Sequence, residues 1–329
     1  MDFPAFSLDT SFLEKAKEPE PEVTYDLLIL GGGPAAMSAA VYAARKLINL
    51  AIITKDFGGQ VRETTEIENW IGFQSINAKD LVDMFQEHVK GFEIPVSIGP
   101  ATVEVKRDVD FFKVRTDDGR IYSGRALILA TGKRHRLLSV PGEKDLVGRG
   151  VAYCATCDAP FFKGKKVVVV GGGNSAFTTA MDLLKVEAGV TLVNFTKGWR
   201  ADEALQQRVR QTDKVSLLDY HQVVRIEGRD RVTAVVVRNR EDEEEEKLDA
   251  SGVFVEIGLL PNNESFKDLV ELNEQGEVIV DCCCQTSEEG IFGAGDVTTV
   301  PHKQIVIAAG EGAKAALSAY NYLIEKSLL

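Results

Sequence analysis

Two short apolar runs, at residues 27–30 and 167–170, each precede a glycine-rich turn and then a segment with helical periodicity. The two helical segments cover residues 37–47 and 177–185. Strands that are buried in a parallel sheet read as continuous apolar runs, because helices cover both of their faces. The order strand, turn, helix therefore predicts the start of a parallel α/β unit at two separate places in the chain.

The pattern around these two starts predicts how the domains are connected. Three strand patterns follow the first start, a crossover containing Pro and Gly at 138–150 leads to the second, and a Pro-Asn-Asn turn at 261–263 marks the return. We predict an α/β fold with two Rossmann-like three-layer nucleotide-binding domains, the second inserted in the first. The strand patterns cover residues 102–105, 111–115 and 126–129. The predicted parts are an arm (1–22), a discontinuous first domain (23–137 and 258–329) and an inserted second domain (138–257).

Both glycine-rich turns, at 31–36 and 171–176, fit the dinucleotide fingerprint G-x-G-x-x-A. The first glycine allows a tight turn, the second lets the backbone approach a pyrophosphate, and the alanine allows the helix to pack closely on the strand. The helix N-terminus then faces the phosphates. A single match is weak evidence, but two matches, each between a strand and a helix, favour one dinucleotide site in each domain over two ordinary glycine turns.

The composition narrows the possible partners. The chain has 329 residues, 44% of them hydrophobic, which is enough for two buried cores. Its net charge of −12 argues against nucleic acid, because phosphate backbones are bound by clustered Lys and Arg. No apolar stretch approaches the ~20 residues that span a bilayer, and the amino terminus lacks a signal-peptide pattern. We therefore expect a cytoplasmic protein with no membrane partner, in which residues 1–22 form an arm or linker.

A dithiol with an acid beside it, Cys154-x-x-Cys157-Asp158, lies between the two fingerprints. A C-x-x-C pair carries two electrons by forming and breaking a disulfide, with a thiolate as the reactive species. A neighbouring carboxylic acid can protonate the thiolate that leaves when another disulfide is cleaved. The alternative is half of a zinc site, but zinc needs four ligands and the chain has no second C-x-x-C. The motifs therefore predict an electron relay that ends in a disulfide.

Two further features carry no assigned role. The triplet Cys282-Cys283-Cys284 follows an apolar run and is expected to continue a strand, where adjacent cysteines do not readily pair; we favour a buried structural role over redox sensing. The charged run 240–247 lies between the apolar alternations 232–237 and 253–257. It is interpreted as a solvated hairpin tip rather than as an acidic docking patch.

From about residue 25 to 324 the chain resembles the low-molecular-weight thioredoxin reductase family, class II of the pyridine nucleotide-disulfide oxidoreductases. Residues 298–305 and 310–315 most resemble the flavin segment in the reductase portion of alkyl hydroperoxide reductase flavoproteins. Those flavoproteins also carry an amino-terminal thioredoxin-like module with its own dithiol; residues 1–22 contain no cysteine, and we expect no such module here. The matching segments are 31–36, 58–60, 68–70, 130–132, 154–158, 171–176 and 293–296.

The resemblance implies an FAD-dependent thioredoxin-disulfide reductase. In the family pattern, Cys157 is the flavin-facing thiol, Cys154 attacks the disulfide of a thioredoxin- or glutaredoxin-like partner, and Asp158 is the general acid. A homodimer is implied, as is rotation of one domain against the other about crossings near Leu138 and Pro261. The residues expected to hold FAD are Gly31, Gly33, Pro34, Ala35, Lys55, Gly59, Gln60, Asn69, Thr131, Gly132, Gly295, Asp296, Gln304 and Ile305.

The electron donor is where the chain departs from the family pattern. NADPH-dependent members place a histidine and several arginines after the second strand of the second domain, whereas residues 194–200 here match only at Arg200. Asn194 could hydrogen-bond the ribose of NADH without a charge, and Lys197 could partly replace a lost arginine, so NADH is favoured over NADPH. Thr178 and Thr179 replace two glutamates, which leaves ferredoxin or a reduced flavoprotein as alternative donors.

Reduction of a peroxidase and non-catalytic redox sensing are the alternative functions. The residues expected to hold the nicotinamide nucleotide are Gly171, Gly173, Asn174, Ser175, Ala176, Asn194, Lys197 and Arg200.

Overall fold

The computed structural model describes residues 17–64 and 66–329, so most of the predicted arm lies outside the described residues. The chain divides into two compact units. The first unit takes in the described residues up to Arg62 together with Ile76–Arg134 and Leu260–Leu329, and the second takes in Glu63–Ser75 and His135–Leu259. Two short ladders lie where the chain passes between the units: β3 (Glu66–Ile67) with β4 (Ile76–Asn77), and β9 (Lys133–His135) with β18 (Leu259–Pro261).

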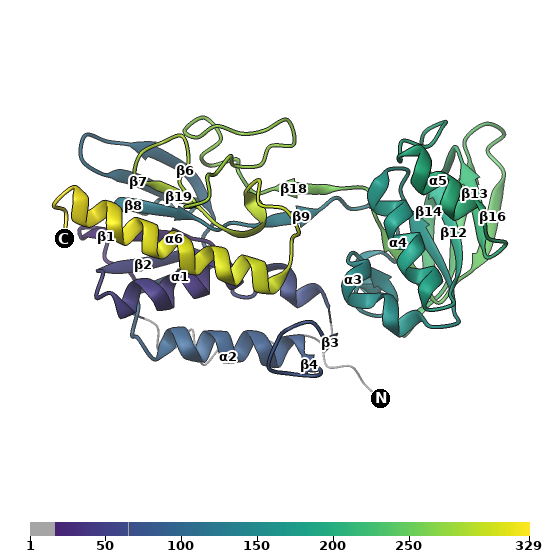
Figure 1. The fold of residues 1–329 in the computed structure, drawn as a ribbon, viewed down its shortest axis with the longest axis horizontal. Helices are drawn as coiled ribbons and strands as arrows, with labels where there is room; N and C mark the ends of the chain where they lie inside the picture. Colours follow the sequence, from purple (N-terminus) through teal and green to yellow (C-terminus); the bar gives the residue numbers. More distant parts are fainter. Residues whose placement is uncertain (1–16, 65) are drawn as a thin grey trace. The chain divides into compact units, whose positions relative to one another are not determined.

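The first unit is built on a mixed sheet in the order β5-β2-β1-β8-β7-β6, and β19 also pairs with β8 (Figure 1). The pairs that include β1, β2, β5 or β19 are parallel, whereas β6, β7 and β8 pair antiparallel. The strands are β1 (Thr24–Leu30), β2 (Leu50–Thr54), β5 (Val96–Ile98), β6 (Thr102–Arg107), β7 (Phe112–Thr116), β8 (Ile121–Leu129) and β19 (Ile291–Gly293). The helices are α1 (Pro34–Arg45), α2 (Ala78–Lys90) and α6 (Ile305–Glu325), with 3₁₀ turns η2 (Gly59–Glu63) and η5 (Gly295–Val297).

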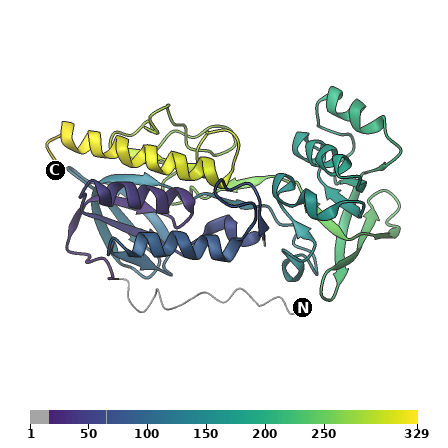
Figure 2. The same ribbon diagram turned by 60° about the horizontal axis from the view of Figure 1, so that its bottom comes forward.

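Strand β1 shows how this sheet is buried on both faces. Leu27 and Ile29 lie in a core shared with α1 and α6, whereas Leu28 and Leu30 lie in the core on the opposite face. Successive side chains of a strand point to opposite faces, so an unbroken apolar run fills both cores. Helices α1 and α6 lie side by side, and small alanines on both helices contribute to the shared core (Figure 2). The first predicted strand and helix are confirmed.

The second unit has a parallel sheet in the order β10-β17-β11-β12-β13 and a separate antiparallel sheet β14-β15-β16. Val167 and Val169 of β11 pack with α4, and Val168 and Val170 pack in the core that includes the antiparallel sheet. Helix, parallel sheet and antiparallel sheet thus form three layers. The strands are β10 (Val151–Ala152), β11 (Lys166–Val170), β12 (Gly189–Asn194), β13 (Val215–Asp219), β14 (His221–Gly228), β15 (Val232–Asn239), β16 (Glu245–Asp249) and β17 (Gly252–Val255). The helices are α3 (Ala155–Asp158), α4 (Asn174–Lys185) and α5 (Glu203–Arg210), with 3₁₀ turns η3 (Lys144–Leu146) and η4 (Ala159–Phe162). The predicted α/β fold with two Rossmann-like domains is confirmed.

The charged run is a hairpin, as predicted, but its second strand differs from the one expected. β15 pairs with β16, which lies within the charged run itself, whereas β17 joins the parallel sheet. The charges are accommodated because ion pairs form along the exposed face, with Glu245 contacting both Arg225 and Arg238. A strand needs only one apolar face, and β16 supplies Leu248 to the core.

Residues 63–75 were expected in the first domain, and the structure groups them with the second unit. The polar contacts of this segment explain the grouping. The Thr64 hydroxyl donates to Asp158 Oδ1 at 3.0 Å, and the Glu63 carboxylate pairs with His135 Nε2 at 3.1 Å. The grouping therefore differs from the predicted boundary for this segment, because apolar periodicity does not report side-chain hydrogen bonds.

The cysteine triplet does not continue a strand. The Asp281 carboxylate accepts hydrogen bonds from the backbone N–H groups of Cys283 and Gln285, both at 2.8 Å, and these bonds fold the segment into a turn. Cys282 and Cys283 are exposed, and only Cys284 is buried. The expected burial is thus confirmed for Cys284 and wrong for the other two cysteines.

The described end of the predicted arm lies against the first unit. The Lys17 carbonyl accepts a hydrogen bond from Val96 N–H at 2.9 Å, and Glu18 pairs with Arg120 at 2.6 Å. Pro19 is buried. Residues 17–22 are therefore tied to the edge of the sheet. Across the described parts of the chain, no helix has the length and apolar character needed to cross a membrane.

Candidate redox site

Cys154 and Cys157 form a disulfide at the start of α3, with their Cα atoms 5.4 Å apart. The two cysteines meet because Cys154 is the N-cap residue of this single turn and Cys157 lies within it. The turn follows the short parallel strand β10, which fixes it at an edge of the sheet. Both cysteines are partly exposed, as a disulfide that exchanges with another protein requires.

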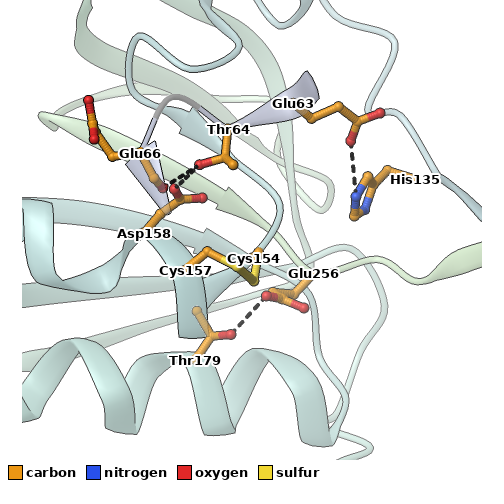
Figure 3. The surroundings of a disulfide bond; sticks show 9 residues. All are labelled: Glu63, Thr64, Glu66, His135, Cys154, Cys157, Asp158, Thr179 and Glu256. Atoms are coloured by element: carbon orange, nitrogen blue, oxygen red, sulfur yellow. Dashed lines mark hydrogen bonds and ion pairs between the residues drawn. A yellow bond between two sulfur atoms is a disulfide. The ribbon is translucent and has the colours of Figure 1, made fainter. Parts of the chain in front are cut away.

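Asp158 lies next to this disulfide and is buried far more than an ordinary carboxylate (Figure 3). Burial raises the pKa of Asp158 to about 6, because the charged form loses its water. The Thr64 hydroxyl donates to Oδ1 at 3.0 Å and opposes this rise by favouring the charged form. A pKa near 6 lets the group hold and release a proton near neutral pH, as a general acid must.

A small pocket of about 110 Å³ adjoins Asp158. Glu63 also lines the pocket, and small or aliphatic residues and two phenylalanines form the rest of its wall. A water molecule takes up roughly 30 Å³ in the liquid, so the pocket has room for a few waters. These waters would connect the Asp158 carboxyl with solvent protons. The remaining lining residues are Gly148, Gly150, Val151, Ala152, Phe161 and Phe162.

A polar network not anticipated from the sequence supports the crossover residues. The His135 ring stacks on the Tyr153 ring with centroids 4.5 Å apart, and the Tyr153 hydroxyl donates to Glu143 at 3.1 Å. Glu143 is fully buried and accepts the backbone N–H groups of Leu138 and Ser139 at 2.9 and 2.7 Å. The buried Glu143 carboxylate thus accepts two backbone donors of the crossover and ties this segment to the second unit.

Glu256 is a second largely buried carboxyl near the disulfide, and no motif in the sequence selects it. It follows β17, and in the view of Figure 3 it lies on the opposite side of the disulfide from Asp158. The Thr179 hydroxyl donates to Glu256 Oε1 at 2.8 Å. Burial raises the pKa of Glu256, and this hydrogen bond opposes the rise. Its signal in the sequence is a lone charge at the end of an apolar strand.

The first fingerprint has the geometry of a phosphate-binding turn. Gly31 has φ +123°, and a side chain there would place Cβ 2.2 Å from the Ala130 carbonyl oxygen. Gly33 caps α1, and nothing lies within 4 Å of the position a Cβ would take. The turn is therefore closed toward the sheet and open in front of the α1 N-terminus, where a pyrophosphate would lie.

Gln60 gives an independent sign that the first unit holds a ligand. Among the described residues, its Nε2 atom is a buried side-chain nitrogen with no hydrogen-bond partner. Such a group is costly unless something accepts its hydrogens. Gln60 lies in η2 beside Gly59, where a Cβ would lie 3.6 Å from the Gly33 Cα. The residues present thus fit FAD, whose polar ring and pyrophosphate would meet Gln60 and the Gly33 turn.

The other residues expected at FAD lie mostly on the first unit. Thr131 donates to the Asn262 carbonyl at 2.7 Å, and Asp296 lies in η5, the element that precedes α6 in the chain. Gln304 is the N-cap residue of α6. Asn69 is the exception, because it belongs to the segment grouped with the second unit. Gly31, Gly33, Pro34, Ala35, Lys55, Gly59, Gln60, Thr131, Gly132, Gly295, Asp296, Gln304 and Ile305 all belong to the first unit.

The second fingerprint repeats the geometry of the first. Gly171 has φ +149°, and a Cβ there would lie 2.3 Å from the Glu256 carbonyl oxygen, whereas the space at Gly173 is open. Asn174 and Asp202 exchange two hydrogen bonds at 3.0 and 2.8 Å. The predicted residues Gly171, Gly173, Asn174, Ser175 and Ala176 thus form one turn at the start of α4.

Asn194 is not placed as the sequence suggested. It is 3% exposed, and its Nδ2 lies within hydrogen-bond distance of the carbonyls of Thr196 and Gly198, at 2.8 and 2.9 Å. The same nitrogen lies 3.1 Å from the Asp219 carboxylate. Asn194 therefore holds the following loop together, while Lys197 and Arg200 are exposed on that loop.

Fold and site together define the class of protein: a two-unit nucleotide-binding oxidoreductase with a C-x-x-C disulfide. The family described as pyridine nucleotide-disulphide oxidoreductase matches residues 25–312. The chain belongs to this family.

The curated relatives include the F subunits of several alkyl hydroperoxide reductases. The protein of Pseudomonas putida is 43% identical over 317 residues, which are 95% of this chain and 61% of that protein. The one of Escherichia coli (strain K12) is 40% identical over 317 residues, covering 94% and 60%. The chain thus spans about three fifths of the length of these relatives.

Solved structures of thioredoxin reductases are also similar to this chain. The enzyme from Streptococcus pyogenes MGAS5005 is 37% identical with a TM-score of 0.86, covering 92% of this chain and 99% of that chain. The thioredoxin reductase from Giardia duodenalis is 29% identical with a TM-score of 0.85, covering 92% and 100%. The resemblance inferred from the motifs is confirmed at the level of the family.

Proposed function

We propose that this protein is an FAD-dependent reductase of protein disulfides, with a thioredoxin- or glutaredoxin-like protein as substrate. The observation that carries this proposal is the Cys154–Cys157 disulfide beside a largely buried carboxyl whose pKa is about 6, in a chain with two nucleotide-binding turns. A disulfide that serves only stability needs neither a proton donor nor nucleotide sites.

The flavin, when bound, supplies two-electron chemistry that a side chain cannot provide: it takes electrons from a reduced nicotinamide and passes them to a disulfide. The Gly31 turn and Gln60 of this chain would hold it. The Gly171 turn would hold the nicotinamide dinucleotide at the start of α4. Each turn thus binds and orients a nucleotide through backbone N–H groups.

The protein's own residues then carry out the thiol-disulfide exchange and the proton transfer. Two electrons break the Cys154–Cys157 bond and leave two sulfurs in the thiol or thiolate form. The Cys154 thiolate attacks the partner disulfide, forms a mixed disulfide and expels one partner thiolate, which takes the proton held by Asp158. Cys157 then attacks Cys154 in the mixed disulfide, restoring the internal disulfide and releasing the second partner thiol. The pocket beside Asp158 has room for water that would return the proton.

Reduction of a peroxidase system is the second candidate function. It is favoured by one observation, namely that curated relatives with 40–44% identity are named as the F subunit of alkyl hydroperoxide reductase. Both functions use the same disulfide chemistry and differ only in the protein that receives the electrons. Separate assays with purified thioredoxin and with a peroxidase of the alkyl hydroperoxide type distinguish them, because only the true acceptor would give rapid turnover.

The donor, the oligomeric state and the hinge remain parts of the proposal. NADH is the donor that the sequence favours, and ferredoxin or a reduced flavoprotein is the alternative if neither nicotinamide reduces the protein. A cytoplasmic homodimer stays a prediction. Rotation between the two units would use the chain crossings near Leu138 and Pro261, and a cross-link between the units that leaves turnover unchanged would contradict it.

The test of the proposed function is an anaerobic titration of the purified flavoprotein with each nicotinamide. Bleaching of the flavin absorbance at near-stoichiometric nicotinamide would support the relay. The variant Cys157→Ser should still bind flavin and should lose reduction of a protein disulfide. Retained turnover in this variant would reject the relay, and Cys282→Ser is the matched control because Cys282 is exposed and lies outside the disulfide.

A further inference from the structure

Beside the loop that follows β12, side chains that follow β12, β13 and β15 form a stack of aromatic and cationic groups to which the proposed function assigns no role. The Arg240 guanidinium lies 3.8 Å from the centroid of the Phe195 ring and 4.7 Å from that of the Tyr220 ring. Arg240 Nη1 also donates to the Phe195 carbonyl at 2.8 Å. Arg240 follows β15, so two segments distant in sequence meet at this point.

This stack lies where a doubly wound sheet binds its ligand. β12 and β13 run parallel and end at Asn194 and Asp219, next to the loop. Ligands of such sheets bind beyond the carboxyl ends of the strands. The loop is also joined to the second fingerprint turn, because the backbone N–H groups of Arg200 and Ala201 donate to the Gly172 carbonyl at 2.8 and 3.1 Å. A dinucleotide whose pyrophosphate lies on that turn would extend its adenosine toward the loop.

The groups that could bind uncharged ribose hydroxyls are already used within the loop. Asn194 is buried, with its amide nitrogen on loop carbonyls. Asp219 accepts the backbone N–H groups of Gly198 and Tyr220, at 2.9 and 3.0 Å. These contacts hold the Asn194 amide and the Asp219 carboxylate within the loop. The side chains of the stack that can bind a phosphate are the cations Arg240 and Lys197, and Glu241 is the acidic group beside them.

Lys197 is the second cation of the stack. Its Nζ atom lies 4.7 Å from the centroid of the Tyr220 ring and 3.1 Å from the Glu241 carboxylate. The Lys197 and Glu241 side chains are 63% and 71% exposed, so their ion pair is weak and a phosphate could displace it. Arg240, by contrast, is held in place by the two rings and the carbonyl. Its planar guanidinium keeps further N–H donors, which suit a phosphate.

We propose that Arg240 and Lys197 recognise the 2′-phosphate of NADPH at the adenosine end of the second-unit site. This inference rests on the proposed function, because it assigns the donor of the same relay. It reverses the preference for NADH expected from the sequence, which rested on the missing family cations at 194–200 and on an Asn194 side chain that faces the ribose. It also gives the charged hairpin a role that its sequence did not suggest.

The experiment measures binding of adenosine 2′,5′-bisphosphate and of 5′-AMP to the purified flavoprotein by calorimetry, without turnover. We expect the bisphosphate to bind roughly tenfold more tightly or better, because a phosphate held by charged donors gains at least that much. Arg240→Gln and Lys197→Gln should each reduce this ratio, and the double variant should bring it close to one. Arg238→Gln is the matched control, since Arg238 is on the same hairpin and pairs with Glu245.

The variant Arg240→Lys separates the effect of the positive charge from the effect of the guanidinium group. If recognition needs the fixed guanidinium, this variant lowers the ratio although it keeps the charge, while the affinity for 5′-AMP stays within about twofold. Equal affinities of the wild type for both nucleotides would overturn the inference and leave the proposed disulfide reduction intact. Absence of binding of either nucleotide would overturn the inference as well, and flavin reduction by dithionite followed by disulfide turnover would then test the relay without a nicotinamide.

Discussion

Two largely buried carboxyl groups near the disulfide, Asp158 and Glu256, have similar surroundings but come from different parts of the chain. Each has a pKa raised by burial, and each accepts a hydrogen bond from a threonine hydroxyl. Asp158 follows Cys157 directly and adjoins a pocket, whereas Glu256 follows a core strand beside the second fingerprint turn. The difference teaches that a raised pKa alone does not mark a proton donor. Access to solvent through the adjoining pocket distinguishes Asp158 from Glu256.

The largest effect that we expect is the loss of turnover in the variant Asp158→Asn. The amide cannot supply a proton to the leaving thiolate, so reduction of a protein disulfide should fall by roughly 10²-fold or more. Reduction of the enzyme's own disulfide by excess dithionite should remain. Stopped-flow measurement of the two half-reactions separates these effects. If both half-reactions slow equally, Asp158 has a structural role instead, and Asp268→Asn, at an exposed position, controls for loss of charge.

The pH dependence of the same half-reaction sharpens the assignment. A general acid acts only when protonated, and the pKa of Asp158 is about 6. The rate of partner reduction should therefore fall as pH rises above about 6, until another ionisation such as that of the attacking thiol takes over. Asp158→Asn should remove this step, whereas Glu256→Gln should retain it. A step that survives in Asp158→Asn belongs to another group.

Folding stability gives a prediction that does not depend on catalysis. Below about pH 4 Asp158 is protonated in both folded and unfolded chains; between about 4 and 6 only the folded chain keeps the proton, so stability falls as pH rises. Above about pH 6 the folded state carries the full cost of the buried charge. Asp158→Asn should then raise the free energy of unfolding by roughly 2–3 kcal/mol at about pH 8 relative to its effect at about pH 4. Urea titrations at the two pH values measure this difference, and an equal effect at both would contradict it.

The parts of this site that the sequence predicts are those whose residues are local. The Gly31 and Gly171 turns, and Cys154 with Cys157 and Asp158, each lie within six consecutive positions, and their spacing alone suggests the chemistry. Glu256 and Thr64 could not be found in this way, because they reach the disulfide region only through the fold. The expectation for Asn194 fails for a related reason: its position after the apolar part of β12 is correct, but burial assigns its amide to the loop. Chain topology follows from apolar periodicity, whereas side-chain partners across elements do not.

The smallest expected effect comes from the Thr179 hydroxyl. Its hydrogen bond to Glu256 favours the charged carboxylate, so Thr179→Val should raise the pKa of Glu256 further and destabilise the fold by about 0.5–1.5 kcal/mol at neutral pH. In Glu256→Gln the carboxyl group that Thr179 contacts is replaced by an amide, so the cost of Thr179→Val should change when the two substitutions are combined. A double-mutant cycle on urea midpoints measures that coupling. Additive effects would show that Glu256 and Thr179 do not depend on each other, and that the resemblance between the two carboxyl sites ends at their burial.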